Sequence, residues 1–162
     1  MQQVRDAEPG DYEALVQLNN AAIPAVNALT VAAFADFAAQ ADLFRVIGPV
    51  GAAEGLLIAL QPGRGYESQN YRWFERAYSS FLYVDRVVVS ETRRGGGLGA
   101  LLYKDFAAAG ERLGVPLLAC EVNLDPPNPG SIRFHERLGF RPVGTQQAGG
   151  KLVQLMIREV AG

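Results

Sequence analysis

A glycine-rich run near the middle of the chain constrains the fold more than any other feature. Residues 93–100 read RRGGGLGA, and they lie between a β-branched stretch at 87–89 and an apolar-periodic segment that begins at Leu98. Glycine lets main-chain amides point together at a ligand without interference from a Cβ atom. A following helix adds unpaired amide donors and the positive end of its dipole. The pattern therefore predicts a strand, a phosphate-binding loop and a helix in succession.

Two familiar phosphate loops fit this run less well. A Walker A loop requires lysine and then a hydroxyl residue after its last glycine, and this run continues as GALL. A dinucleotide fingerprint fits better, because Gly95, Gly97 and Ala100 match G-x-G-x-x-G/A and Glu121 follows roughly twenty residues later. However, residues 90–94 separate the strand from the glycines, whereas a dinucleotide turn follows its strand directly.

A third interpretation rests on two motifs in order. Residues 94–99 read R-x-x-G-x-G after the valine-rich strand, and residues 128–140 read NPGSIRFHERLGF. In the second motif Asn128 or Ser131 can cap a helix, and Gly139 can end it in a left-handed turn. Together the motifs resemble the acetyl-coenzyme A loop and the later helix of the GNAT superfamily of N-acetyltransferases. The chain resembles a branch of predicted bacterial GNAT proteins, and this resemblance extends over most of its length. No substrate is carried over from that branch.

The resemblance implies an α/β fold of the GNAT type in a single domain over residues 1–162. That fold is a mixed, mostly antiparallel central sheet of six or seven strands with a splayed parallel pair, flanked by about four helices. A length of 162 residues and 49% hydrophobic content suit one domain with its own core. The patterns predict strands at 2–7, 43–47, 53–60, 81–89, 115–123, 140–145 and 152–160. Helices are predicted from about 11, at 30–41, at 98–113 and after 128, and residues 63–80 are predicted to form a partly helical loop.

Composition narrows the function classes. With 15 basic and 17 acidic residues the net charge is -2, so no basic face is expected to bind nucleic acid. No apolar stretch reaches the roughly twenty residues of a membrane span, and no leader pattern opens the sequence, so we expect a cytoplasmic protein. The one cysteine, Cys120, is expected in the core, without a disulfide or a metal site. Edge strands and the C-terminal hairpin can support a homodimer.

The chemistry implied by the resemblance is attack of a primary amine on the thioester of acetyl-coenzyme A, with no metal. A neutral amine, donors for the oxyanion and a proton for the departing sulfur are then needed. The family usually presents a tyrosine after the aromatic residue of its second motif, and this chain has His135 after Phe134. We expect either that His135 is the proton donor, since its ordinary pKa near 6.5 leaves some imidazolium at neutral pH, or that it packs beside the cofactor. Tyr83 and Tyr103 are alternative donors.

Two carboxylates are candidates for the general base. Glu121 lies in an otherwise apolar strand, where a carboxylate is costly unless it is paired or functional. Asp85 alternates with Val87 and Val89, which predicts that it shares their face and that Arg86 points the other way. Each carboxylate has a structural interpretation as well, and deprotonation through ordered water is a further alternative.

The remaining site residues follow from the resemblance and from composition. The implied cofactor-binding residues are Val87, Val88, Val89, Arg94, Gly95, Gly96, Gly97, Leu98, Gly99, Ala100, Asn123, Asn128, Ser131, Phe134 and His135. Asn20, Asn27 and Trp73 are candidates for contact with the acceptor, which we expect to be a small-molecule amine or an N-terminal amino group. The alternatives are a non-catalytic acyl-coenzyme A binding module and, third, a nucleotide-dependent oxidoreductase.

Overall fold

The computed structural model describes residues 3–160, which form two compact units. The first unit contains residues 3–60 and 84–109, and the second contains residues 61–83 and 110–160. Two elements run through both units, namely the strand β4 (Leu82–Val89) and the helix α4 (Leu98–Leu113). None of the helices within residues 3–160 is long and apolar enough to cross a membrane.

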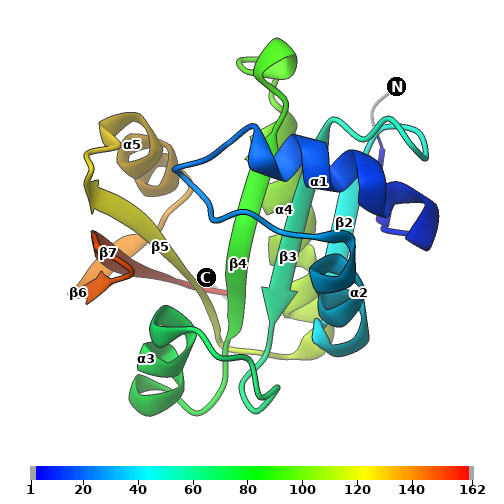
Figure 1. The fold of residues 1–162 in the computed structure, drawn as a ribbon. Helices are drawn as coiled ribbons and strands as arrows, with labels where there is room; N and C mark the ends of the chain where they lie inside the picture. The colour runs from blue at the N-terminus through cyan, green and yellow to red at the C-terminus, as the bar shows by residue number, and fades with distance from the viewer. Residues whose placement is uncertain (1–2, 161–162) are drawn as a thin grey trace. The chain divides into compact units, whose positions relative to one another are not determined.

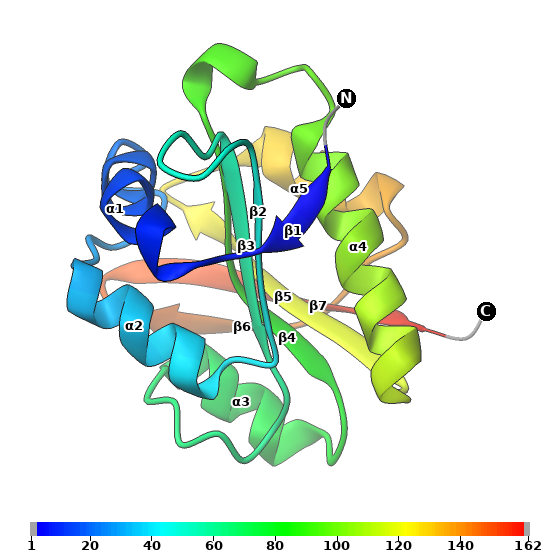
Figure 2. The same ribbon diagram turned by 90° about the vertical axis from the view of Figure 1, so that its right-hand side faces the viewer.

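The first unit is a sheet covered on both faces. Besides β4 and α4, its elements are β1 (Val4–Asp6), α1 (Tyr12–Asn20), α2 (Val31–Gln40), β2 (Leu43–Ile47) and β3 (Gly55–Leu60), with short 3₁₀ turns at Pro9–Asp11 and Glu91–Arg93. β2 pairs antiparallel with β1 and with β3. The helices α1 and α2 cover one face of these strands and α4 covers the other (Figures 1 and 2). Every residue of β3 is buried, as expected for a strand with helices on both sides.

Neighbouring residues of β2 show how the sequence builds these layers. Phe44 stacks on Tyr12 of α1 and Phe34 of α2, with ring centroids 6.2 and 5.9 Å apart. The next residue, Arg45, forms an ion pair of 3.0 Å with Asp105 of α4 on the opposite face. Successive side chains of a strand point to opposite faces, so one apolar and one charged residue serve two different layers.

The second unit is built on a three-stranded antiparallel arrangement. Its further elements are α3 (Gln69–Ala77), β5 (Leu117–Asp125), α5 (Pro129–Arg137), β6 (Arg141–Ala148) and β7 (Lys151–Glu159). β7 pairs antiparallel with β5 on one side and with β6 on the other. The helix α3 contacts β6, and α5 contacts β5.

The predicted parallel pair is present. The strand order is β1-β2-β3-β4-β5-β7-β6, and β4 and β5 are parallel. Within residues 3–160 their parallel register consists of Leu82 with Leu118 and Tyr83 with Ala119. β4 continues to Val89 and β5 to Asp125 beyond this register, and the splay of the pair stays a prediction.

The segment 63–80, predicted to be a partly helical loop, contains the helix α3 at residues 69–77. Ser68 caps α3 by accepting a hydrogen bond of 3.3 Å from the main-chain amide of Tyr71. Tyr71 and Phe74 are buried and pack near Tyr83, with ring centroids 5.6 and 5.7 Å away. Aromatic residues three apart form one apolar helix face, and the short length of the helix hid this periodicity among its charged neighbours.

Candidate functional site

The glycine-rich loop joins β4 to α4 as predicted, and its backbone requires glycine. The 3₁₀ turn ends at Arg93, Gly95 and Gly97 have φ of +81° and +83°, and α4 begins at Leu98. A Cβ atom at Gly95 or Gly97 would meet nothing within 4 Å, so the space beside both residues is open. The loop therefore combines left-handed glycines, an open side and the start of a helix of four turns.

The two adjacent arginines of the loop have different surroundings. Arg93 donates to the carboxylate of Glu54 at 2.6 Å, and the amide of Ser90 donates to the carbonyl of Glu54 at 2.8 Å. These bonds attach the base of the loop to the residue before β3. Arg94 is exposed, so its positive charge is presented at the surface rather than used within the fold.

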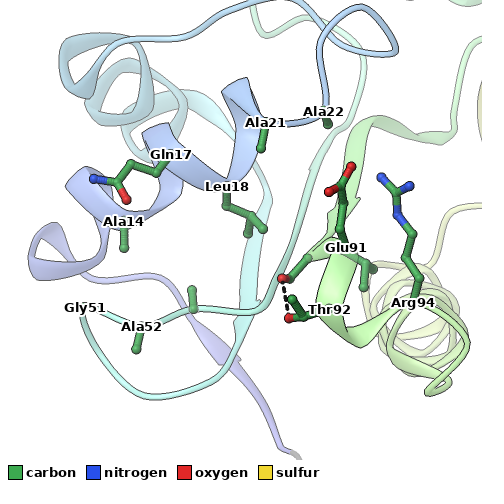
Figure 3. Close-up of a pocket in the computed structure, with 13 residues that line it drawn as sticks. Ala14, Gln17, Leu18, Ala21, Ala22, Gly51, Ala52, Glu91, Thr92 and Arg94 are labelled. Carbon is green, nitrogen blue, oxygen red and sulfur yellow. Dashed lines mark hydrogen bonds between the residues drawn. The ribbon is translucent and has the colours of Figure 1, made fainter.

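A cavity of about 410 Å³ lies beside this turn in the first unit (Figure 3). It is lined by α1 and the residues after it, by residues 51–53, and by residues 89–92 with Arg94. Two of the predicted cofactor residues, Val89 and Arg94, are therefore in its wall. Ala21 and Ala22, which follow α1, also line it. They are far from residues 89–94 in the sequence, so the sequence does not reveal that they share a cavity with them.

The prediction that Arg86 points away from Asp85 is wrong. Arg86 Nε donates to Asp85 Oδ2 at 2.7 Å, and the two side chains are only 5% and 6% exposed. Arg86 also donates to the side-chain oxygens of Asn19 and Asn27, both at 2.9 Å, and lies over the ring of Phe37. A buried charge needs a partner, and the long guanidinium side chain bends to reach one. Asp85 therefore takes part in a structural ion pair.

The two asparagines predicted at the acceptor pocket hold the connection between α1 and α2. Asn20 Oδ1 accepts from the amide of Leu29 at 3.0 Å and from Asn19 at 2.9 Å. Asn27 accepts from Arg86 through its side chain and from Asn19 through its carbonyl, at 2.9 Å in each case. The side-chain oxygens of Asn20 and Asn27 are thus engaged within the protein, and contact with an acceptor stays a prediction.

In the second unit, Glu121 lies in a polar cluster. Its Oε1 accepts from the hydroxyl of Tyr83 at 2.9 Å and from Nδ2 of Asn70 at 3.3 Å. Asn70 Oδ1 accepts in turn from Gln146 Nε2 at 2.8 Å. Burial, and to a lesser extent the charge of Glu121, raise the pKa of the neighbouring Cys120 thiol well above its ordinary value. The sequence indicated that Glu121 needed partners, but it did not identify Asn70 or Gln146.

His135 is buried in α5 and is largely neutral in this environment. Burial lowers its pKa, and the hydrogen bond to the carbonyl of Ser131 opposes that shift. Nδ1 lies 2.7 Å from this carbonyl, which only accepts, so we assign the proton of the neutral ring to Nδ1 and a lone pair to Nε2. The imidazolium fraction at neutral pH is therefore smaller than the ordinary pKa of histidine suggested.

Other predicted residues shape the second unit. Asn128 caps α5 by accepting from the amide of Ser131 at 3.3 Å, and Gly139 follows α5 with φ of +94°. Asn123 lies at an irregularity in the pairing of β5 with β7. Trp73 packs on Gly144, where an added Cβ would be 2.9 Å from the indole. Over residues 3–160, no group of three or more His, Cys, Asp or Glu side chains is placed to hold a metal ion.

Known proteins are similar to this chain in sequence and in fold. The model of the acetyltransferase (GNAT) family matches residues 49–140. No curated protein sequence matches the chain significantly. The structure is similar to that of Ard1 from Thermoplasma volcanium, with a TM-score of 0.79, 19% identity, and 99% of each chain covered.

Two further solved structures are similar. One is the ribosomal-protein-S18-alanine N-acetyltransferase from Escherichia coli, with a TM-score of 0.75, 17% identity, and coverage of 100% of this chain and 96% of that one. The other is yncA, described as a putative acetyltransferase from Salmonella typhimurium with its cofactor acetyl-CoA. Its TM-score is 0.72 at 18% identity, with 98% of this chain and 94% of that one covered. At these identities the similarity establishes the shared fold.

Proposed function

This chain belongs to the acetyltransferase (GNAT) family, and from that premise we propose that it is an acetyl-CoA-dependent N-acetyltransferase. The acceptor is a primary amine of a small molecule or an N-terminal amino group. The observation that carries the proposal is the turn between β4 and α4, with left-handed Gly95 and Gly97 and an open side. The yncA structure with acetyl-CoA and the Escherichia coli enzyme named for an alanine acceptor support it.

The residues of the turn fit a diphosphate. Amides at the start of α4 lack carbonyl partners within the helix, and the helix dipole favours a negative charge there. Arg94 adds a fixed positive charge, and the main chain of residues 87–89 is the proposed contact for the pantetheine arm. Acetyl-CoA, when bound, supplies the thioester that the amine attacks. We propose that the two units function as one acetyltransferase domain.

Within the second unit, Glu121 is the proposed general base. Its carboxylate is held by donors from Tyr83 and Asn70, which favour the ionised form that accepts a proton from an ammonium group. Asp85 is not proposed for this role, because its carboxylate is paired with Arg86. Proton donation by His135 to the departing sulfur stays a prediction, and it requires the imidazolium form that burial disfavours.

Ligand-dependent thermal unfolding tests the cofactor. Coenzyme A and acetyl-CoA are expected to raise the melting temperature, because a ligand that binds only the native state stabilises it by mass action, by about 2.7 kcal/mol at a hundredfold excess over Kd. NAD and ATP, at matched concentrations, are the controls and are expected to have no effect. Equal stabilisation by NAD would contradict the proposal and favour the oxidoreductase.

Thiol release measured with polyamines, amino acids, aminoglycosides and peptides tests the transfer itself. Turnover with any amine supports the enzyme and identifies its acceptor class. Binding of coenzyme A without turnover on any amine favours the alternative, a non-catalytic acyl-coenzyme A binding module. A homodimer and a cytoplasmic location stay predictions from the sequence.

A further inference from the structure

Glu121 is the end point of a chain of hydrogen bonds that crosses four elements of the second unit. Gln146 of β6 donates to Asn70 of α3 at 2.8 Å, and Asn70 donates to Glu121 of β5 at 3.3 Å. Tyr83 of β4 donates to the same carboxylate oxygen at 2.9 Å. Two donors therefore converge on Oε1, one from a strand and one from α3.

The orientation of the Asn70 amide is set by its partners at both ends, Glu121 and Gln146. An asparagine amide has a donor end and an acceptor end, and the wrong end against a carboxylate is repulsive. Because Gln146 donates to Oδ1 of Asn70, the amide nitrogen of Asn70 faces Glu121. The ionised carboxylate of Glu121 only accepts, so it favours the same orientation, and the bond from Gln146 is a second constraint on the Asn70 amide.

The docking of α3 on β6 brings these side chains together. Asn70 and Trp73 are three residues apart on α3 and share a face, while Gly144 and Gln146 are two apart on β6 and share a face. Trp73 lies on Gly144, where an added Cβ would be 2.9 Å from the indole, and Asn70 meets Gln146. Glycine at 144 therefore permits the close approach that places Asn70 within reach of β5.

Other titratable groups lie near Glu121 and contribute to the pH dependence of this site. Tyr83 of β4 and the adjacent Cys120 are titratable neighbours of Glu121, and α3 and β6 contribute the amides of Asn70 and Gln146. β7 is paired at this point through Leu155, and α5, which also packs on β5, carries His135. Cys120 stays protonated because burial raises its pKa well above the ordinary value.

We propose that Asn70 and Gln146 are positioning residues that orient Glu121 and keep it ionised for its role as general base. The inference rests on the proposed function, and it adds two residues that never need to touch the substrate. Asn70 acts directly on the carboxylate, and Gln146 acts through Asn70. Donors favour the charged form of a carboxyl, so their loss shifts its titration to higher pH.

The first test is the pH dependence of kcat/KM in Gln146→Leu and Asn70→Ala. The acidic limb is expected to move to higher pH in both variants, with a rate loss of roughly tenfold near neutrality, because general base catalysis requires the ionised form. Gln147→Leu is the matched control, since the same substitution falls on the next, exposed residue of β6, and its profile is expected to match the native one. An unmoved acidic limb in both variants, each folded by thermal unfolding, overturns the proposal.

The second test needs no turnover and separates this inference from the proposed function. The side-chain carboxyl of Glu121 is titrated by ¹³C NMR in the native protein and in Gln146→Leu, with Glu121→Gln used to assign the resonance. A midpoint at higher pH in Gln146→Leu supports the positioning role even if no amine is acetylated, in which case the proposed function fails alone. An unchanged midpoint overturns the role of Gln146 whether or not the protein is an enzyme.

Discussion

At the scale of single residues, both the backbone conformation at Gly97 and the proposed approach of the cofactor require a residue without a side chain. Its φ of +83° disfavours any side chain, and a Cβ there points into open space beside the loop. Gly97→Val is expected to raise the Kd for coenzyme A at least about tenfold, or about 1.4 kcal/mol, by blocking backbone approach. Isothermal titration calorimetry measures this change.

Gly63→Val is the matched control for Gly97→Val. Gly63 has φ of +82° and likewise no atom within 4 Å of an added Cβ, but it belongs to a different loop in the second unit. Both variants are expected to lose about 1–3 kcal/mol of stability from the same strain. Only the variant in the glycine-rich loop is expected to lose affinity, and equal affinities contradict the loop assignment.

His135 makes a second prediction at this scale. Burial lowers its pKa in the folded state, so below about pH 6.5 the unfolded state binds more protons than the folded one. The contribution of His135 is therefore fully present above that pH and is lost as the pH falls through the folded pKa. The chain has one histidine, so urea unfolding of His135→Leu between about pH 7 and about pH 5 should show a flatter dependence. An identical slope in the variant would contradict this prediction.

At the scale of elements, Arg86 connects β4 to three segments of the first unit. It pairs with Asp85, donates to Asn19 of α1 and Asn27 of the α1–α2 connection, and lies 5.6 Å from the ring of Phe37 in α2. Arg86→Met is expected to lower the free energy of unfolding by about 3–5 kcal/mol, because it leaves the carboxylate of Asp85 buried without its guanidinium. Chemical denaturation measures this loss.

The double variant Asp85→Asn with Arg86→Met is the control for Arg86→Met. It removes both charges, so it is expected to be more stable than Arg86→Met alone. Hydrogen exchange in residues 21–29 is expected to increase in the single variant, since Asn27 loses its donor. If Arg86→Met unfolds at the same denaturant concentration as the native protein, the ion pair contributes little to stability.

At the scale of the whole molecule, the family match and the structural similarity cover different extents of the chain. The family model matches residues 49–140, which begins before β3 and ends before β6. The solved structures cover 98–100% of the chain at 17–19% identity, so the segments outside the family match also follow the shared fold. Within residues 3–160 the parallel pair is β4 with β5, and each family motif begins a few residues after one of these two strands.

Several features could be predicted from the sequence because their causes are local. The glycine-rich loop and the helix at 98–113 follow from glycine conformations and from apolar periodicity within one segment. Thr30 caps α2 by accepting from the amide of Ala33 at 3.1 Å, a bond between residues three apart. The resemblance to the GNAT family rests on two such local motifs, and the family match confirms it.

Other features depend on partners far away in the chain, and only the tertiary structure decided them. Asn70 and Glu121 are 51 positions apart, and Gln146 and Asn70 are 76 apart, so no pattern in either segment indicates the bond. Likewise, strand alternation predicted that Asp85 and Arg86 diverge, whereas burial brought the two charges together. The sequence alone determined the features that depend on one segment, namely the glycine turns, the helix caps and the apolar helix faces. Packing decided which buried polar groups meet. A buried polar group without a partner costs free energy, and the partner can be any suitable side chain that the fold brings within reach.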